Sequence, residues 1–142
     1  MRFWDTSALV PLVVRERESA RAARWLREDP QVVVWTLTRV ELLSALARRR
    51  RLEPRDARTL RLARRDLIDA WTGWSEVTAV EVVRRHAERL VESHPVRAAD
   101  ALQIAAALVV AGDSPADLEF VTFDASQAAA AEREGLRVLG AV

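Results

Sequence analysis

The chain has 142 residues, of which 50% are hydrophobic and 30% are charged, and its 22 basic and 21 acidic side chains leave a formal net charge of +1 at pH 7. This balance is typical of a soluble globular protein and excludes a disordered segment. Every basic residue is arginine and no cysteine is present, which excludes disulfides, thiol nucleophiles and any mechanism with an obligatory lysine.

Length and hydropathy bound the organisation of the chain. A length of 142 residues fits one domain, which we expect to span residues 1–142. The longest purely apolar run, at residues 104–111, is far shorter than the roughly 20 residues of a membrane helix. We therefore expect a cytoplasmic protein with no membrane segment.

Short apolar runs alternate with longer helical patterns along the chain. In chain order we expect a strand over residues 2–4, a helical region from 6 to about 27, a strand over 32–35, a helix from 38 to about 51 and another from 54 to about 71. A weaker strand over 74–78 precedes a helix that ends near 93, and then come a helix over 98–111, a strand over 120–123, a helix over 125–134 and a last strand over 137–139. Strands separated by helices are typical of βαβ units, so the sequence predicts the α/β class: three layers, α/β/α, around a parallel sheet of four to five short strands.

Four carboxylates stand where predicted strands end or predicted helices begin: Asp5, Glu41, Asp100 and Asp124. Ligands of open parallel sheets bind beyond the carboxyl ends of the strands, where the chain turns into the next helix. Asp5, Glu41 and Asp124 each follow a predicted strand, so the βαβ topology places them on one edge of the sheet. Asp100 opens an alanine-rich helix and can point toward the same edge.

Each of these acids also has a purely structural interpretation. Asp5 and Asp124 are suitable N-caps, whose side-chain oxygens accept hydrogen bonds from backbone N–H groups. Thr38 and Glu41 fit a capping box, in which Glu41 reaches back to the threonine N–H. Asp100 complements the dipole of its helix. Taken singly, each acid can have either a structural role at a helix end or a role in a ligand site.

The helix that begins near Asp100 makes the four acids harder to explain by capping. Residues 99–111 are apolar almost all round, with Gln103 as the only other polar side chain, so we expect this helix to be buried. A buried carboxylate is costly unless it is paired, and two of them ~4 Å apart repel by roughly 4 kcal/mol at an effective dielectric constant of ~20. A divalent cation is the simplest compensation, and an all-oxygen ligand set favours Mg²⁺ or Mn²⁺. Such a site can support the attack of water on a phosphodiester.

In this order and spacing, the four acids resemble those of the PIN-domain nucleases, and among them the VapC-type toxins of bacterial toxin–antitoxin pairs. The matching segments are residues 3–9, 38–42, 97–105 and 120–124. The resemblance covers essentially the whole chain. It implies a PIN-like fold, an RNA substrate and a cognate antitoxin protein as partner.

The resemblance also implies roles for particular residues. The activity would be that of a Mg²⁺-dependent endoribonuclease, with Mn²⁺ as a substitute, that leaves a 5′-phosphate and a 3′-hydroxyl. Asp5 and Asp100 would be the main metal ligands, and Glu41 and Asp124 would complete the catalytic site. The small polar residues with a supporting role would be Thr6, Ser7 and Thr122.

A strongly basic segment is hidden by the near-zero net charge. Residues 48–65 contain nine arginines against two acidic residues. Guanidinium groups match phosphate oxygens, so this segment is a candidate surface for RNA, and the alternatives are a solvated helix face or a contact with a protein partner. The candidate RNA-binding residues are Arg48, Arg49, Arg50 and Arg51.

The predicted helix over residues 54–71 also carries apolar side chains. They are Leu60, Leu62, Leu67 and Ile68. They can provide a surface for a homodimer, which we expect, or a groove for an antitoxin.

Two other function classes fit the sequence less well. A module of the same fold could hold RNA or a protein without cleaving it, but decayed nuclease sites usually lose one acid and this one has all four. A phosphatase or phosphoacceptor domain also places acids at strand ends, but such domains ordinarily use a lysine beside the acid, and this chain has none.

Overall fold

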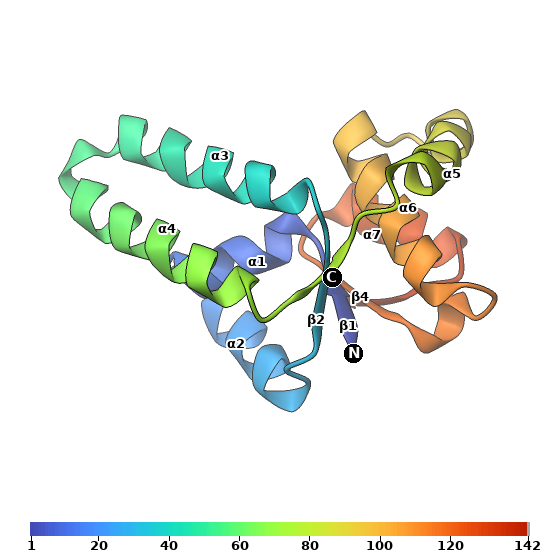
Figure 1. The fold of residues 1–142 in the computed structure, drawn as a ribbon, viewed down its shortest axis with the longest axis horizontal. Helices are drawn as coiled ribbons and strands as arrows, with labels where there is room; N and C mark the ends of the chain where they lie inside the picture. The colour runs from blue at the N-terminus through green and yellow to red at the C-terminus, as the bar shows by residue number, and fades with distance from the viewer. Residues whose placement is uncertain (142) are drawn as a thin grey trace.

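The computed structural model describes residues 1–141 and is built around one parallel sheet (Figure 1). Its five strands lie in the order β3-β2-β1-β4-β5, and every neighbouring pair is parallel. The strands are β1 (Arg2–Trp4), β2 (Val32–Trp35), β3 (Ser75–Val77), β4 (Glu119–Thr122) and β5 (Arg137–Gly140). They lie close to the predicted segments, and β1 and β2 coincide with them.

Seven α-helices of the described chain cover the two faces of the sheet. One face carries α1 (Thr6–Val13), α2 (Ser19–Glu28), α3 (Thr38–Leu52) and α4 (Ala57–Trp71). The other face carries α5 (Val80–Ser93), α6 (Ala98–Ala111) and α7 (Ala125–Arg133). Figure 1 shows the first group at the left and below the sheet and the second at the right. This arrangement confirms the predicted α/β class with three layers.

The strands bury both faces because their side chains alternate between two hydrophobic cores. Phe3 stacks on Phe120 of the neighbouring strand, with ring centroids 5.6 Å apart, in the core under α5–α7. The next residue along each strand, Trp4 and Val121, lies in the core under α1–α4. The continuous apolar runs seen in the sequence are thus strands that are covered from both sides.

Two predictions about the first half of the chain were wrong in detail. The helical region expected over residues 6–27 is two helices, because α1 ends at the extended residue Val14 and α2 starts at Ser19. Pro54 begins a short 3₁₀ turn (Pro54–Asp56) that precedes α4, rather than α4 itself. A second 3₁₀ turn (Pro115–Asp117) precedes β4.

The apolar surface predicted on α4 is mostly part of the core. Leu60 and Leu67 are buried against α1–α3, and Ile68 is half-buried. Leu62 alone of the four predicted residues is exposed, at 43%. These leucines therefore stabilise the packing of α4, and they do not form the continuous apolar face that a dimer or an antitoxin groove would need.

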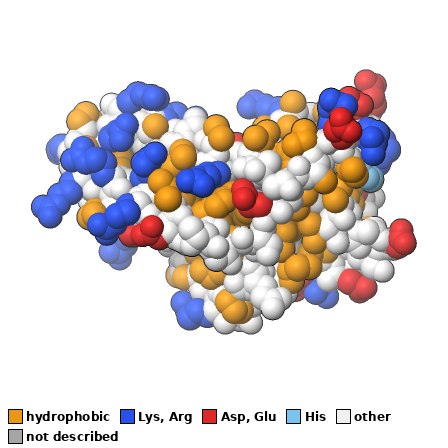
Figure 2. All heavy atoms as spheres, viewed as in Figure 1, with side chains coloured by type: hydrophobic (Ala, Val, Ile, Leu, Met, Phe, Trp, Pro, Cys, Tyr) orange, Lys and Arg blue, Asp and Glu red, His pale blue; other side chains and the backbone are white. Residues whose placement is uncertain are grey.

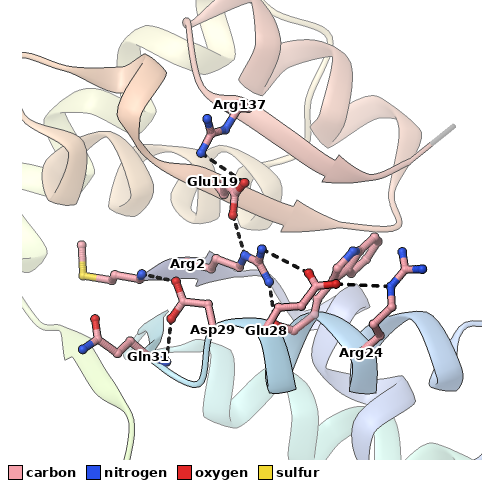
Figure 3. A network of polar contacts seen from close by, with 9 residues as sticks. Arg2, Arg24, Glu28, Asp29, Gln31, Glu119 and Arg137 are labelled. Carbon is pink, nitrogen blue, oxygen red and sulfur yellow. Dashed lines mark hydrogen bonds and ion pairs between the residues drawn. The ribbon is translucent and has the colours of Figure 1, made fainter.

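An ion-pair network ties the amino ends of the strands together (Figure 3). The Arg2 guanidinium contacts Glu119 of β4 and Glu28 of α2, and it donates to the backbone oxygen of Trp25 at 2.6 Å. Glu119 also contacts Arg137 of β5. The network links β1, β4, β5 and α2 at the edge of the sheet opposite to the predicted acidic site.

The strand order creates a crevice at the carboxyl edge of the sheet. From β1 the chain builds outward through β2 to β3, and then returns to the other side of β1 with β4 and β5. Ligands of open α/β sheets bind at the point where the order reverses, because the following helices diverge there. That point lies between β1 and β4, which Asp5 and Asp124 follow.

Among the described residues, no helix combines the length and apolar character needed to cross a bilayer.

Candidate active site

The four acids predicted from the sequence line one cleft. Its volume is about 390 Å³, and its walls come from α1, α3, α6 and α7 and the turns that precede them. The acids are Asp5, Glu41, Asp100 and Asp124, and Thr6 and Ser7 lie among them. Segments as distant in sequence as residues 5 and 124 therefore meet at the carboxyl edge of the sheet.

Asp5 is the most deeply buried of the four acids, with none of its surface exposed. It caps α1: its Oδ1 accepts hydrogen bonds from the Ser7 hydroxyl at 2.8 Å and from the Ala8 backbone N–H at 3.2 Å. Its Oδ2 is buried and has no hydrogen-bond partner within the described chain. Burial raises the pKa of Asp5 to about 7, although the hydrogen bonds act in the opposite direction. The buried Oδ2 of Asp5 therefore lacks a hydrogen-bond donor or a cation that would stabilise its negative charge.

Ser7 and Thr122 join the turn after β1 to the turn after β4. Their hydroxyl oxygens lie 3.2 Å apart. Ser7 also accepts a hydrogen bond from the Phe123 N–H at 2.8 Å, and Thr122 accepts one from the Asp124 N–H at 3.0 Å. These two small polar residues therefore set the relative position of Asp5 and Asp124.

Glu41 faces the cleft from α3, and the capping box considered as its structural alternative does not form. Leu37 occupies the N-cap position of α3, with no side-chain cap. Instead of turning back to Thr38, the Glu41 carboxylate accepts hydrogen bonds from the Thr6 hydroxyl at 2.6 Å and from the Gln103 amide at 3.2 Å. Burial raises the pKa of Glu41, and the nearby charge of Asp100 acts in the same direction.

Asp100 and Asp124 form the other wall of the cleft. Asp124 caps α7 and accepts from the Gln127 N–H at 2.8 Å and the Ser126 hydroxyl at 2.9 Å. Asp100, in the first turn of α6, accepts from the Gln127 side-chain amide at 3.0 Å. Burial and then the charge of Asp124 raise the pKa of Asp100. The two carboxylates thus repel each other and share one glutamine as donor.

The cleft provides the donor chemistry of a hard divalent cation. Its acidic lining supplies only oxygen ligands, and the unpartnered Oδ2 of Asp5 marks where positive charge is lacking. The acids surround the cleft without closing on one point: over residues 1–141, no three Asp, Glu or His side chains are close enough to hold one ion directly. The residues fit a cation by charge and donor type.

The four candidate RNA-binding arginines have different surroundings. Arg48 lies on the same face of α3 as Glu41, and it lines the cleft. Arg49 forms an ion pair with Glu16, and Arg50 and Arg51 are exposed near the end of α3. Figure 2 shows basic side chains spread over the arm formed by α3 and α4, residues 38–71, at the left of the molecule. Of this group, Arg48 and Arg49 line the cleft that contains the acids.

Sequence reasoning missed three residues that the fold brings to the site. Arg97 precedes α6 and, together with Arg48, lines an adjoining hollow that Glu41, Asp100 and Asp124 also border. Gln103 and Gln127 are buried and donate to site carboxylates. Gln103 carried a signal, as the one polar residue besides Asp100 in an apolar helix, whereas no sequence pattern marked Gln127.

Comparisons with known proteins agree with this geometry. The family model of the PIN domain matches residues 2–133. Over 108 residues, which are 76% of this chain and 75% of the relative, the chain is 32% identical to the ribonuclease VapC45 of Mycobacterium tuberculosis.

Solved structures show the same fold at low sequence identity. A toxin–antitoxin complex from Klebsiella pneumoniae matches with a TM-score of 0.63 at 16% identity, over 89% of this chain and 89% of that chain. The Mycobacterium tuberculosis toxin VapC20, which cleaves the sarcin–ricin loop, matches with a TM-score of 0.61 at 20% identity, over 92% of this chain and 95% of that chain. The chain therefore belongs to the PIN-domain family and is a distant homologue of VapC ribonucleases.

Proposed function

We propose that this protein is a Mg²⁺-dependent endoribonuclease that acts in the cytoplasm as the toxin of a toxin–antitoxin pair. One observation carries the proposal: four carboxylates from four separate parts of the chain line one cleft, and the deepest of them has a buried oxygen without a partner. Structural caps do not require such convergence, whereas a cation site does. The distant homology to VapC ribonucleases supports RNA as the substrate.

Asp5 and Asp100 are the proposed ligands of the cation, and Mn²⁺ can replace Mg²⁺ there. The cation supplies positive charge that polarises a phosphodiester and acidifies a bound water. Asp5 offers its free Oδ2, and Asp100 faces it across the cleft with one oxygen engaged by Gln127. The fold already brings the carboxylates together, so much of the conformational entropy of the site is lost when the chain folds and not when the cation binds.

Glu41 and Asp124 complete the proposed catalytic site as acceptors. Each keeps acceptor capacity on the cleft side with which to orient a water and take up its proton. Thr6 holds Glu41 through its hydroxyl at 2.6 Å. Ser7 and Thr122 hold Asp5 and the Asp124 turn, so the supporting role of the three small polar residues is to fix the acids.

The proposed path for RNA runs over the basic surface beside the cleft. Arg48 and Arg97 border the same hollow as the acids, and neither forms an ion pair within residues 1–141. Their guanidinium groups are therefore available to phosphate oxygens on either side of the scissile bond. Arg50 and Arg51 extend the path along the arm, whereas Arg49 contributes less because Glu16 pairs with it.

The proposed partner is a cognate antitoxin protein. One solved structure with the same fold is a toxin–antitoxin complex from Klebsiella pneumoniae, which supports a partner of this kind. A homodimer remains our proposal for the free protein, through a surface other than the apolar residues of α4, which are mostly buried in the core. Light scattering at high concentration tests it, and a mass that stays monomeric contradicts it.

The test of the nuclease uses end-labelled RNA with Mg²⁺, with EDTA, and with isosteric amide variants. We expect cleavage with Mg²⁺ that leaves 5′-phosphate ends, no cleavage with EDTA, and a loss of at least about 100-fold in rate for Asp5→Asn and Asp100→Asn, because the amides keep the shape and remove the charge that binds the cation. Asp113→Asn is the matched control, since Asp113 is exposed after α6. Wild-type rates in Asp5→Asn and Asp100→Asn contradict the proposal.

One observation favours a second function, a module that binds RNA without cleaving it. The acids are too widely spaced for any three of them, in the part of the chain described, to hold one ion directly. A binding module predicts RNA affinity that EDTA does not change, together with intact RNA after prolonged incubation with Mg²⁺ or Mn²⁺. The same labelled RNA distinguishes the two functions.

A further inference from the structure

Two buried glutamines donate hydrogen bonds to acids of the cleft, and one of them, Gln127, also lines it. Gln103 is 0% exposed and Gln127 is 5% exposed, whereas Gln31, the third glutamine of the chain, is exposed. Burying an amide costs free energy unless its polar atoms are hydrogen-bonded. Both buried glutamines have an Oε1 without a partner among the described residues. Their burial is therefore costly, and only their donated hydrogen bonds compensate it.

Gln103 holds Glu41 from behind. Its Nε2 lies 3.2 Å from a Glu41 oxygen, 2.8 Å from the Thr38 hydroxyl and 3.2 Å from the Thr6 hydroxyl. A carboxylate can only accept hydrogen bonds, so the NH₂ end of the amide must face Glu41. Since Thr6 donates to the other Glu41 oxygen, both oxygens of this carboxylate are fixed by neutral donors.

Gln127 holds two acids at once. Its side-chain amide donates to Asp100 at 3.0 Å, and its backbone N–H donates to Asp124 at 2.8 Å. These two carboxylates line the same cleft, and like charges at close range repel each other. One residue of α7 thus ties together two like charges that come from different helices.

The donors around the four acids are all uncharged. The chain has 22 arginines, yet no ion pair found among residues 1–141 involves Asp5, Glu41, Asp100 or Asp124; the one acid of the cleft lining that is paired is Glu16, with Arg49. A guanidinium in the place of either glutamine would also orient a carboxylate, but it would cancel the negative charge that attracts a cation. A neutral amide fixes the geometry and leaves that charge in place.

We propose that Gln103 and Gln127 are positioning residues, whose neutral amides hold Glu41 and Asp100 in the orientation that receives a divalent cation. The inference rests on the proposed function, because it takes the cleft to be a cation site. It adds two residues that act through the acids, without direct contact with the cation or the RNA.

The first experiment measures Mn²⁺ binding to the metal-free protein by calorimetry. The variants are Gln103→Met and Gln127→Met, which keep the length of the side chain and remove its hydrogen bonds, with Gln31→Met as the matched control. We expect Mn²⁺ affinity to fall by about 10- to 100-fold in each buried variant, as for other residues that orient metal ligands, and to stay unchanged in Gln31→Met. Circular dichroism establishes that each variant is folded.

A double-mutant cycle separates positioning from a general loss of packing. If Gln103 acts through Glu41, then Gln103→Met weakens Mn²⁺ binding much less in a Glu41→Gln background than in the wild type. Equal losses in both backgrounds overturn the inference for Gln103. Gln127→Met with Asp100→Asn forms an independent cycle, which decides the matter if Gln103→Met does not fold.

The wild-type protein distinguishes failure of the inference from failure of the proposed function. If wild-type protein binds no Mn²⁺ and cleaves no RNA, the cation site itself is refuted and the inference falls with it. If wild-type protein binds Mn²⁺ and cleaves RNA while both methionine variants bind Mn²⁺ as tightly, only the inference is refuted.

Discussion

The charge of Asp5 should destabilise the protein when no metal is bound. Asp5 has no exposed surface, and burial raises its pKa from 3.8 to about 7. Between these two pH values the folded protein holds a proton that the unfolded chain releases, so stability falls as the pH rises through this window. A shift of about 3 pKa units corresponds to about 4 kcal/mol once the pH exceeds 7.

Asp5→Asn should remove this cost without disturbing the cap of α1. Asparagine retains the Oδ1 that accepts from Ser7 and Ala8, and it places a neutral group where Oδ2 has no partner. In EDTA, we expect the variant to be about 4 kcal/mol more stable than wild type at pH 8 and less than half as much more stable at pH 5. Urea unfolding at the two pH values measures both differences.

Asp124→Asn is the matched control for this experiment. Asp124 also caps a helix through Oδ1, but it is half-buried. We expect its substitution to change stability by less than about 1 kcal/mol at either pH. If Asp5→Asn is no more stable than wild type at pH 8, or if the difference is the same at both pH values, the buried charge is not the cause of the instability and the electrostatic account of the site is wrong.

Three further predictions concern stability away from the cleft. Glu134, which binds Arg89 in a bidentate pair, has its pKa lowered from 4.5 to about 2; Glu134→Gln should cost about 1 kcal/mol at pH 7 in urea unfolding, and the difference from wild type should shrink as the pH falls from 4.5 toward 2. Arg2→Met should lower the free energy of unfolding by about 2–3 kcal/mol, because Glu119 loses its partner in β1. At a temperature where the variant is fully folded, its Mg²⁺-dependent cleavage should stay at the wild-type rate, because the network lies at the far edge of the sheet. Gly140→Ala should lower the thermal midpoint by an amount that corresponds to about 2 kcal/mol or more, because φ is +124° and the new Cβ would overlap a backbone oxygen of β4; an unchanged midpoint would contradict the β4–β5 register.

The sequence by itself predicted the layers of the fold and four of the acids that line the cleft. The β-branched run at Val32–Trp35 has no polar face, so it can only be a strand covered on both sides. Ala98–Ala111 is apolar on nearly every side, which predicts a buried helix with the boundaries that the structure has. Asp5 and Asp124 were predicted both as caps and as site residues, and in the structure they cap helices and line the cleft together.

Only the tertiary structure decided which hydrogen bonds the acids make. Local sequence allowed a capping box for Glu41 as well as a place in the site, but in the structure Glu41 accepts from Gln103, 62 residues away, and not from the Thr38 N–H. The same holds for Gln127 and Asp100, which share no motif and meet because α6 and α7 pack on one face of the sheet. Local patterns report caps and periodicity over a few residues, whereas the partners of a buried side chain depend on which distant segments the sheet order brings beside it.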